Sequence, residues 1–162
     1  MPSFNEHISQ AIKNFKVLEE IDANVSNCED WKVTIAFYTA LHLVSAHLAS
    51  HNLQRSSHTS IEQAIKANQS TKIDDQIFVH YTSLYQLSRR SRYLIQDGGT
   101  NSGPAIQMNP KHFSKALNKL EAIIKYFDSM HNLNFPSIAI DCVHYSQKSD
   151  TKHILKKQIV ST

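Results

Sequence analysis

The segment 30-DWKVTIAFYTALHLVSAHLAS-50 decides the fold, because it contains no Gly or Pro and carries apolar residues around most of a helical circumference. A helix that is apolar nearly all round has neighbours on several sides, so we expect this segment to be the central helix of a bundle. Asp30, His42 and His47 make it too polar for a membrane span. Asn27 as N-cap and Asp30 in the first turn predict where the helix begins.

Four further helices are predicted from apolar residues that recur at helical spacing, over about residues 4–23, 59–67, 72–95 and 110–131. Capping residues mark their expected starts, in chain order Ser3 with Glu6, Thr59 with Glu62, Thr71 with Asp74, and Asn109 with Pro110. Short polar connections favour antiparallel neighbours. The sequence therefore predicts an all-α fold, an up-and-down helical bundle of about five helices over residues 1–131.

Residues 132–162 differ in character from this bundle and are predicted to form a C-terminal tail. Pro136 ends the helical periodicity, and residues 137–145 alternate enough to predict a single strand. Such a strand has to pack on the bundle or pair with another chain. The basic segment 153–160, HILKKQIV, is expected to form a short amphipathic turn.

Composition favours a single helical domain, since the 162 residues include only three Gly and four Pro. The formal net charge of +3 comes mostly from the tail, so a nucleic-acid footprint over the whole surface is not indicated. Cys28 and Cys142 are far apart and fit no metal or redox spacing. The first ten residues lack a secretory pattern, and we expect a cytoplasmic protein without a membrane partner.

The histidines of the central segment are the first candidates for chemistry. His47 and His51 share a helical face, but no acidic residue follows His47 and no third ligand is evident, so no metal is expected. His42 lies one turn after Tyr38, a spacing more typical of a hydrogen-bonded core pair than of a proton shuttle. No Gly-x-Gly-x-x-Gly or Walker pattern occurs, so no cofactor is expected either.

Arg89 and Arg92 are the strongest candidates for binding an anion. They project from neighbouring turns of one helix face, and each guanidinium offers a planar fork of donors that suits a phosphate. Tyr93 is adjacent, and His58 from the preceding loop is a candidate acid or base at neutral pH. The alternative is that both arginines pair with Asp or Glu across a helix interface.

Three blocks of the chain, in order, resemble a prokaryotic branch of the HEPN superfamily over approximately residues 1–131. The blocks are Asp30-Trp31-x-Val33-Thr34-x-x-Phe37-Tyr38-x-Ala40-Leu41-His42, Ser57-His58-Thr59 and Tyr81-x-x-Leu84-x-x-x-Ser88-Arg89-x-x-Arg92-Tyr93. The resemblance implies a small helical bundle, commonly a homodimer. Many members are metal-independent ribonucleases of toxin, abortive-infection or CRISPR systems. Others are inactive, or are partners of nucleotidyltransferase subunits.

Active members of that superfamily carry an Arg followed, after four to six residues, by a His. This chain lacks that His, because the corresponding positions after Arg89, Arg90 and Arg92 fall on residues 94–99. Only the Arg carries over, to Arg89 or Arg92.

These observations lead to two hypotheses. The first is a HEPN-like dimer that binds RNA or a nucleotide phosphate through Arg89, Arg92 and Tyr93, with His58 as candidate catalyst and Tyr38 and His42 in support. The setting expected from the resemblance is a toxin–antitoxin or antiviral defence system. The second is a non-catalytic interaction module that docks a partner protein encoded nearby, or a nucleotidyltransferase subunit.

Overall fold

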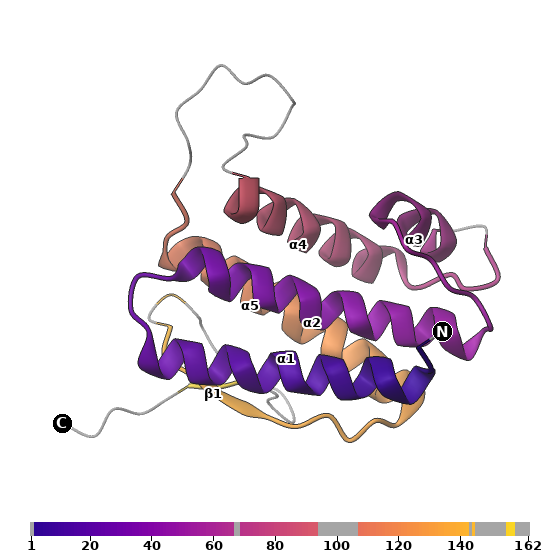
Figure 1. Ribbon diagram of the computed structural model, residues 1–162, viewed down its shortest axis with the longest axis horizontal. Coiled ribbons are helices and arrows are strands. Elements are labelled where there is room, and N and C mark those ends of the chain that lie inside the picture. The colour runs from indigo at the N-terminus through magenta and orange to yellow at the C-terminus, as the bar shows by residue number, and fades with distance from the viewer. Residues whose placement is uncertain (1, 67–68, 94–106, 143, 145–154, 158–162) are drawn as a thin grey trace, which may run out of the picture.

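The computed structural model of the chain describes residues 2–66, 69–93, 107–142, 144 and 155–157 (Figure 1). In these residues the elements are α1 (Phe4–Asn24), α2 (Glu29–Ser50), α3 (His58–Ile65), α4 (Asp75–Tyr93), α5 (Pro110–His131), β1 (Ile138–Ile140) and β2 (Leu155–Lys157). The predicted all-α bundle with a short C-terminal tail is confirmed.

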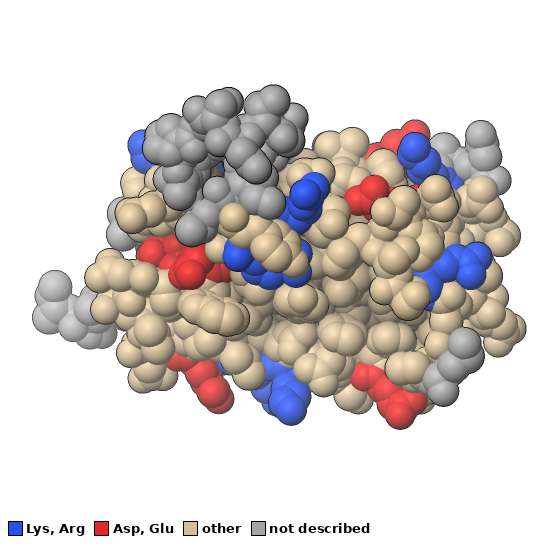
Figure 2. All heavy atoms as spheres, turned by 45° about the horizontal axis from the view of Figure 1, so that its top comes forward, with Lys and Arg blue, Asp and Glu red and all other residues tan. Residues whose placement is uncertain are grey.

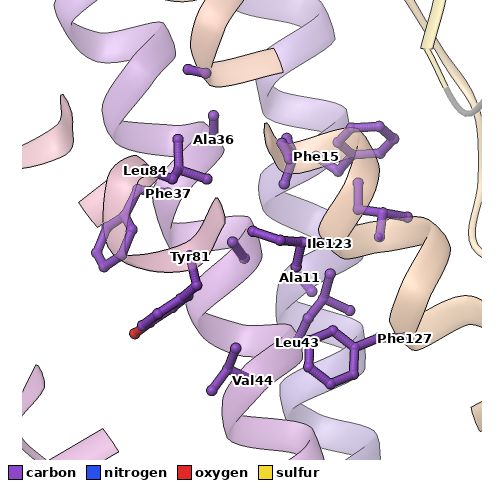
Figure 3. Packing of buried hydrophobic residues seen from close by; sticks show 14 of the residues in the cluster. Ala11, Phe15, Ala36, Phe37, Leu43, Val44, Tyr81, Leu84, Ile123 and Phe127 are labelled. Carbon is purple, nitrogen blue, oxygen red and sulfur yellow. The ribbon is translucent and has the colours of Figure 1, made fainter. Parts of the chain in front are cut away.

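Helix α2 lies at the centre of the bundle, as its composition predicts, and contacts α1, α4 and α5. Figure 1 shows that α1 and α2 run antiparallel, as the short connection between them predicts. Side chains from opposite sides of α2 fill different parts of one core. Figure 3 shows Phe37 on the same side as Tyr81, whereas Leu43 lies with Phe127 on the other side.

The burial of α2 also explains its apolar composition. Within the described residues, α2 is the helix that is long enough to cross a membrane and apolar enough to be considered, with a mean hydropathy of 1.3. By length and composition alone it is a weak candidate for a membrane span. However, 61% of that window is buried inside the bundle. A core helix has this composition because it packs against neighbours all round, so α2 is not a convincing membrane span.

The predicted starts of α1 and α5 are confirmed. The Ser3 hydroxyl accepts from the Glu6 backbone N–H while the Glu6 carboxylate accepts from the Ser3 backbone N–H, which forms a capping box. The Asn109 side chain accepts from two backbone N–H groups of the first turn of α5, with Pro110 in the first helical turn.

The predicted start of α2 is wrong. Cys28 is the N-cap and makes no side-chain capping bond. Asn27 instead adopts a left-handed conformation, with φ at 55°, which Asn tolerates better than most residues. Asn27 therefore belongs to the turn between α1 and α2, while Glu29 and Asp30 supply the acidic first turn.

The caps predicted for α3 and α4 are also corrected. Ser57 and Ser60 form the capping box of α3, so the helix begins before Thr59. The Asp74 carboxylate caps α4 by accepting from two backbone N–H groups of its first turn. Thr71 is buried instead, and its hydroxyl donates to the Ala64 carbonyl at 2.5 Å. It closes the end of α3 rather than opening α4.

The strand predicted within residues 137–145 forms as β1, and its partner is β2 of the same chain. The two pair in parallel, with Ile138 opposite Leu155. Residues 155–157 are thus a strand, where the sequence predicts an amphipathic turn. The first part of the predicted tail shares the bundle core, through buried side chains at Phe135, Ile138, Ile140 and Cys142.

The other edge of β1 is bound by carboxylates of α1. Glu19 Oε1 accepts from the Ala139 N–H, and Asp22 Oδ2 accepts from the Asp141 N–H, each at 2.6 Å. Alternate N–H groups of a strand point to the same side, which explains the spacing of two residues. Both edges of β1 are therefore occupied within the chain, so we do not propose that it adds a strand to a partner.

Asp22 also holds a buried charge. The Lys32 ammonium lies 3.0 Å from Asp22 Oδ1, and the two side chains are 8% and 1% exposed. Lys32 further lies over the Phe113 ring of α5, at 5.4 Å from its centroid. The pair therefore joins α1, α2 and α5 to the backbone beside β1.

We expect Asp22→Ala to lower the free energy of unfolding by roughly 3–5 kcal/mol, because it leaves the Lys32 charge buried without a partner. Urea unfolding at pH 7 measures the change. Lys125→Ala is the control, since Lys125 is 40% exposed and pairs with Glu121 within one helix. That variant should lose less than about 1 kcal/mol.

Adding Lys32→Met to Asp22→Ala should recover much of the lost stability, because the uncompensated charge is removed. A loss in Asp22→Ala no larger than that in Lys125→Ala would contradict the structural role assigned to the pair.

Candidate phosphate-binding site

All of the predicted site residues except His42 gather near Phe37, where α2, α3 and α4 meet. The buried Phe37 ring lies 5.4 Å, between centroids, from both His58 of α3 and Tyr85 of α4. His58 and Tyr85 are 4.5 Å apart, and Tyr38 lies 5.6 Å from Phe37. We call these four rings, Phe37, Tyr38, His58 and Tyr85, the aromatic cluster.

Arg92 is held against this cluster by two hydrogen bonds. Its Nε donates to the Ser88 carbonyl at 3.2 Å, and its Nη1 donates to the Tyr38 hydroxyl at 3.3 Å. The guanidinium carbon also lies 5.7 Å from the Tyr38 centroid and 5.1 Å from that of Tyr93. Ring faces attract a cation, so these rings help to fix the position of Arg92.

Arg89 lies one turn earlier and is exposed, with its guanidinium carbon 5.9 Å from the Tyr85 centroid. Neither Arg89 nor Arg92 forms an ion pair with Asp or Glu in the part of the chain that the structure describes. The alternative expectation, pairing with acidic residues across a helix interface, is therefore not seen there.

A buried pair of hydroxyls sets the rotation of α4 against α2. The Ser91 hydroxyl donates to the Ser88 carbonyl at 2.9 Å, so it is the Thr34 hydroxyl that donates to Ser91 Oγ, at 2.8 Å. Because Ser88 and Ser91 face α2, Arg89 and Arg92 lie on the sides of this contact. The Thr34–Ser91 contact thereby positions both guanidinium groups.

His58 is suited to act as a base rather than an acid. Burial, and secondly the charge of Arg92, lower the pKa of His58, so the ring is neutral at pH 7. Its Nδ1 atom is buried and has no hydrogen-bond partner among the described residues. The histidine whose pKa Arg92 affects thus comes from α3.

A pocket of about 190 Å³ adjoins Arg92 and is lined by Asp30, Trp31, Thr34, Ser91 and Arg92. The sequence pattern does not predict this pocket, because the apolar composition of the segment predicts that Trp31 is buried. Trp31 is instead 62% exposed. The signal was the spacing of Trp31, Thr34 and Tyr38, which puts them on one stripe of α2.

His42 does not belong to this site. Its Nδ1 atom lies 3.1 Å from Nδ1 of His7, on α1. The predicted Tyr38–His42 pair is not seen among the described residues: the Tyr38 hydroxyl accepts from Arg92, and His42 Nδ1 lies against His7. The hydrogen bond between Tyr38 and Arg92 is consistent with the supporting role expected for Tyr38. His42 makes no contact with the arginines among the described residues.

His47, His51 and His131 form a second imidazole cluster at the far end of α2. His47 Nε2 lies 3.2 Å from the Thr71 carbonyl, so it has to donate, and Nδ1 then accepts from His131 Nε2 at 3.3 Å. Within the described residues, no group of three His, Cys, Asp or Glu has a geometry for holding a metal ion. Burial lowers the pKa of both His47 and His131.

We expect the free energy of unfolding to fall as the pH is lowered from about 7 to about 5. The unfolded chain takes up protons near the ordinary His pKa of about 6.5, whereas folded His47 and His131 resist protonation. Stability is therefore complete above about pH 6.5 and is lost as the pH falls toward the lowered pKa values. Urea midpoints between pH 5 and 8 measure this.

His47→Gln should be less stable at pH 7 but should show a flatter dependence on pH, since a buried imidazole is gone. His144→Gln is the control, because that side chain is exposed, and it should keep the original slope. Equal slopes in all three proteins would contradict the role assigned to His47.

The three sequence blocks on which the expectation of a HEPN-like protein rests all contribute to the site around Phe37. Tyr38 comes from the first, His58 from the second, and Arg89 and Arg92 from the third. Comparisons with protein-family models, with curated proteins and with solved structures find no match to this chain. Its function has to be inferred from the residues of the site.

Proposed function

We propose that this chain is a HEPN-like protein that binds a phosphate group of RNA or of a nucleotide through Arg89 and Arg92. One observation carries the proposal. Two arginines lie on one helix face beside a cluster of rings, without a carboxylate partner in the described residues. A positive charge held without its counter-charge is suited to an anion from outside.

Arg92 keeps donors available for such a ligand. Its two hydrogen bonds use Nε and Nη1, so the Nη2 group has no bond to the described residues. The ring contacts fix the plane of the guanidinium before a ligand arrives, which reduces the entropy lost on binding. Arg89, one turn away, supplies a second fork for the same or a neighbouring phosphate.

The charge distribution supports a small ligand over a long duplex. Figure 2, which brings the α3 and α4 side forward, shows Lys and Arg interspersed with Asp and Glu, without a continuous basic band among the described residues. A protein that follows a duplex backbone needs many such contacts. Two arginines match one or two phosphates.

The same residues would support metal-independent cleavage of RNA. Neutral His58 would take the proton of a 2′-hydroxyl as its oxygen forms a bond to phosphorus, and the arginines would stabilise the charged phosphorane. The bond from phosphorus to the 5′-oxygen then breaks, and that oxygen takes a proton from water. The setting proposed is a toxin–antitoxin or defence system, in which the protein forms a homodimer.

Arg92→Ala and Arg89→Ala should each weaken the binding of a fluorescein-labelled single-stranded RNA. Each should also make the plot of log binding constant against log salt concentration less steep, by about the slope of one phosphate contact. Fluorescence anisotropy at several salt concentrations measures both quantities. Arg92→Lys should recover only part of the affinity, because it keeps the charge but loses the planar fork. Growth of cells that express each variant tests toxicity in parallel.

Arg55→Ala is the matched control, since Arg55 is an exposed arginine that bonds only the neighbouring Gln54 carbonyl in the described residues. It should bind RNA as the parent protein does. If Arg89→Ala and Arg92→Ala bind as tightly as Arg55→Ala, the phosphate site is not where we propose it.

A further inference from the structure

The exposed Trp31 beside Arg92 is not explained by the fold. Trp31 is 62% exposed and Tyr93 is 59% exposed, although both are large aromatic residues. Trp31 lines the pocket that Arg92 also lines, and Tyr93 lies 5.1 Å from the Arg92 guanidinium carbon. Two exposed aromatic side chains thus flank the arginine proposed to hold a phosphate.

We propose that the ligand of this site is a single-stranded RNA, with a guanine base stacked on Trp31 and its phosphate on Arg92. This inference rests on the proposed phosphate site and names what that site recognises. Base–aromatic stacking is a general means of holding an unpaired nucleotide, and Arg beside the ring adds a second contact.

The geometry favours an unpaired base over a duplex. The pocket holds about 190 Å³ and Trp31 forms part of its lining, so a base has to leave its own stack to enter. Bases of a duplex are stacked on one another and present only their edges. Among the described residues, Arg92 is the one cation that lines the pocket, which also argues against binding along a duplex backbone.

The polar groups of the pocket favour guanine. Asp30 places a carboxylate in the lining, and a carboxylate accepts but does not donate. The Thr34 hydroxyl, which also lines the pocket, already donates to Ser91, so it adds no donor to this wall. Among the bases, guanine presents two adjacent donors, N1–H and the 2-amino group, on its Watson–Crick edge, which suits an acceptor wall.

The chain offers a direct probe, because Trp31 is its only Trp. The protein is titrated with octauridylates that carry G, A, C or U at one central position, and Trp emission is recorded. Anisotropy of the same labelled RNAs reports binding independently. We expect the G-containing RNA to bind most tightly and to quench Trp31, and the duplex form of that RNA to do neither.

Variants separate stacking from phosphate binding. Trp31→Ala should bind the G-containing RNA roughly 5- to 100-fold more weakly, the loss expected for one base–aromatic stack, and Trp31→Phe should bind between this variant and the parent. Asp30→Asn should lose the preference for G. Val79→Ala is the control, since Val79 is also exposed, on α4, and it should bind normally.

The outcomes distinguish the two proposals. Binding by anisotropy that depends on Arg92 but leaves Trp31 emission unchanged would overturn the stacking inference and leave the phosphate site standing. Absence of binding to any of the RNAs would overturn both. Equal binding of the G-containing and all-U strands would overturn the assignment of guanine.

Discussion

The structure depends on the burial of one helix on several sides. Because α2 presents apolar side chains around most of its circumference, α1, α4 and α5 all have to pack against it. The hydrophobic effect sets this arrangement but does not fix how each neighbour is rotated. Rotation is fixed by a few buried polar contacts, in which a misplaced partner leaves a donor or a charge unsatisfied. The Thr34–Ser91 pair does this for α4, and the Asp22–Lys32 pair does it for α1.

The candidate site follows from the α2–α4 contact. Once Ser88 and Ser91 face α2, the residues on either side of them carry the guanidinium groups outward over Tyr38 and Tyr85. Ring faces and a tyrosine hydroxyl hold Arg92 in place, and it makes no ion pair among the described residues. The same packing lowers the pKa of His58, since the ring that lies against Phe37 and Tyr85 loses water.

Much of this fold was predictable because its signals are local. The apolar circumference of α2 predicted its central position, and the caps at Ser3 and Asn109 predicted two helix starts. Predictions that required knowledge of distant neighbours were less successful. Tyr38 and His42 are well spaced to pair, but Arg92 and His7 from other helices take their polar atoms. Apolar periodicity likewise predicts that Trp31 is buried, but periodicity cannot show whether another element packs over that position, and Trp31 is 62% exposed.

The pairing of β1 with β2 was not predictable for the same reason, since a parallel pair joins segments that share no local pattern. The carboxylates that bind β1 on its other edge lie 120 and 119 positions earlier in the chain. During translation, α1 therefore emerges from the ribosome long before the backbone groups that satisfy Glu19 and Asp22 are made. Until then Phe15 lacks the Phe135 ring that later packs against it, so the nascent bundle exposes apolar surface at this position.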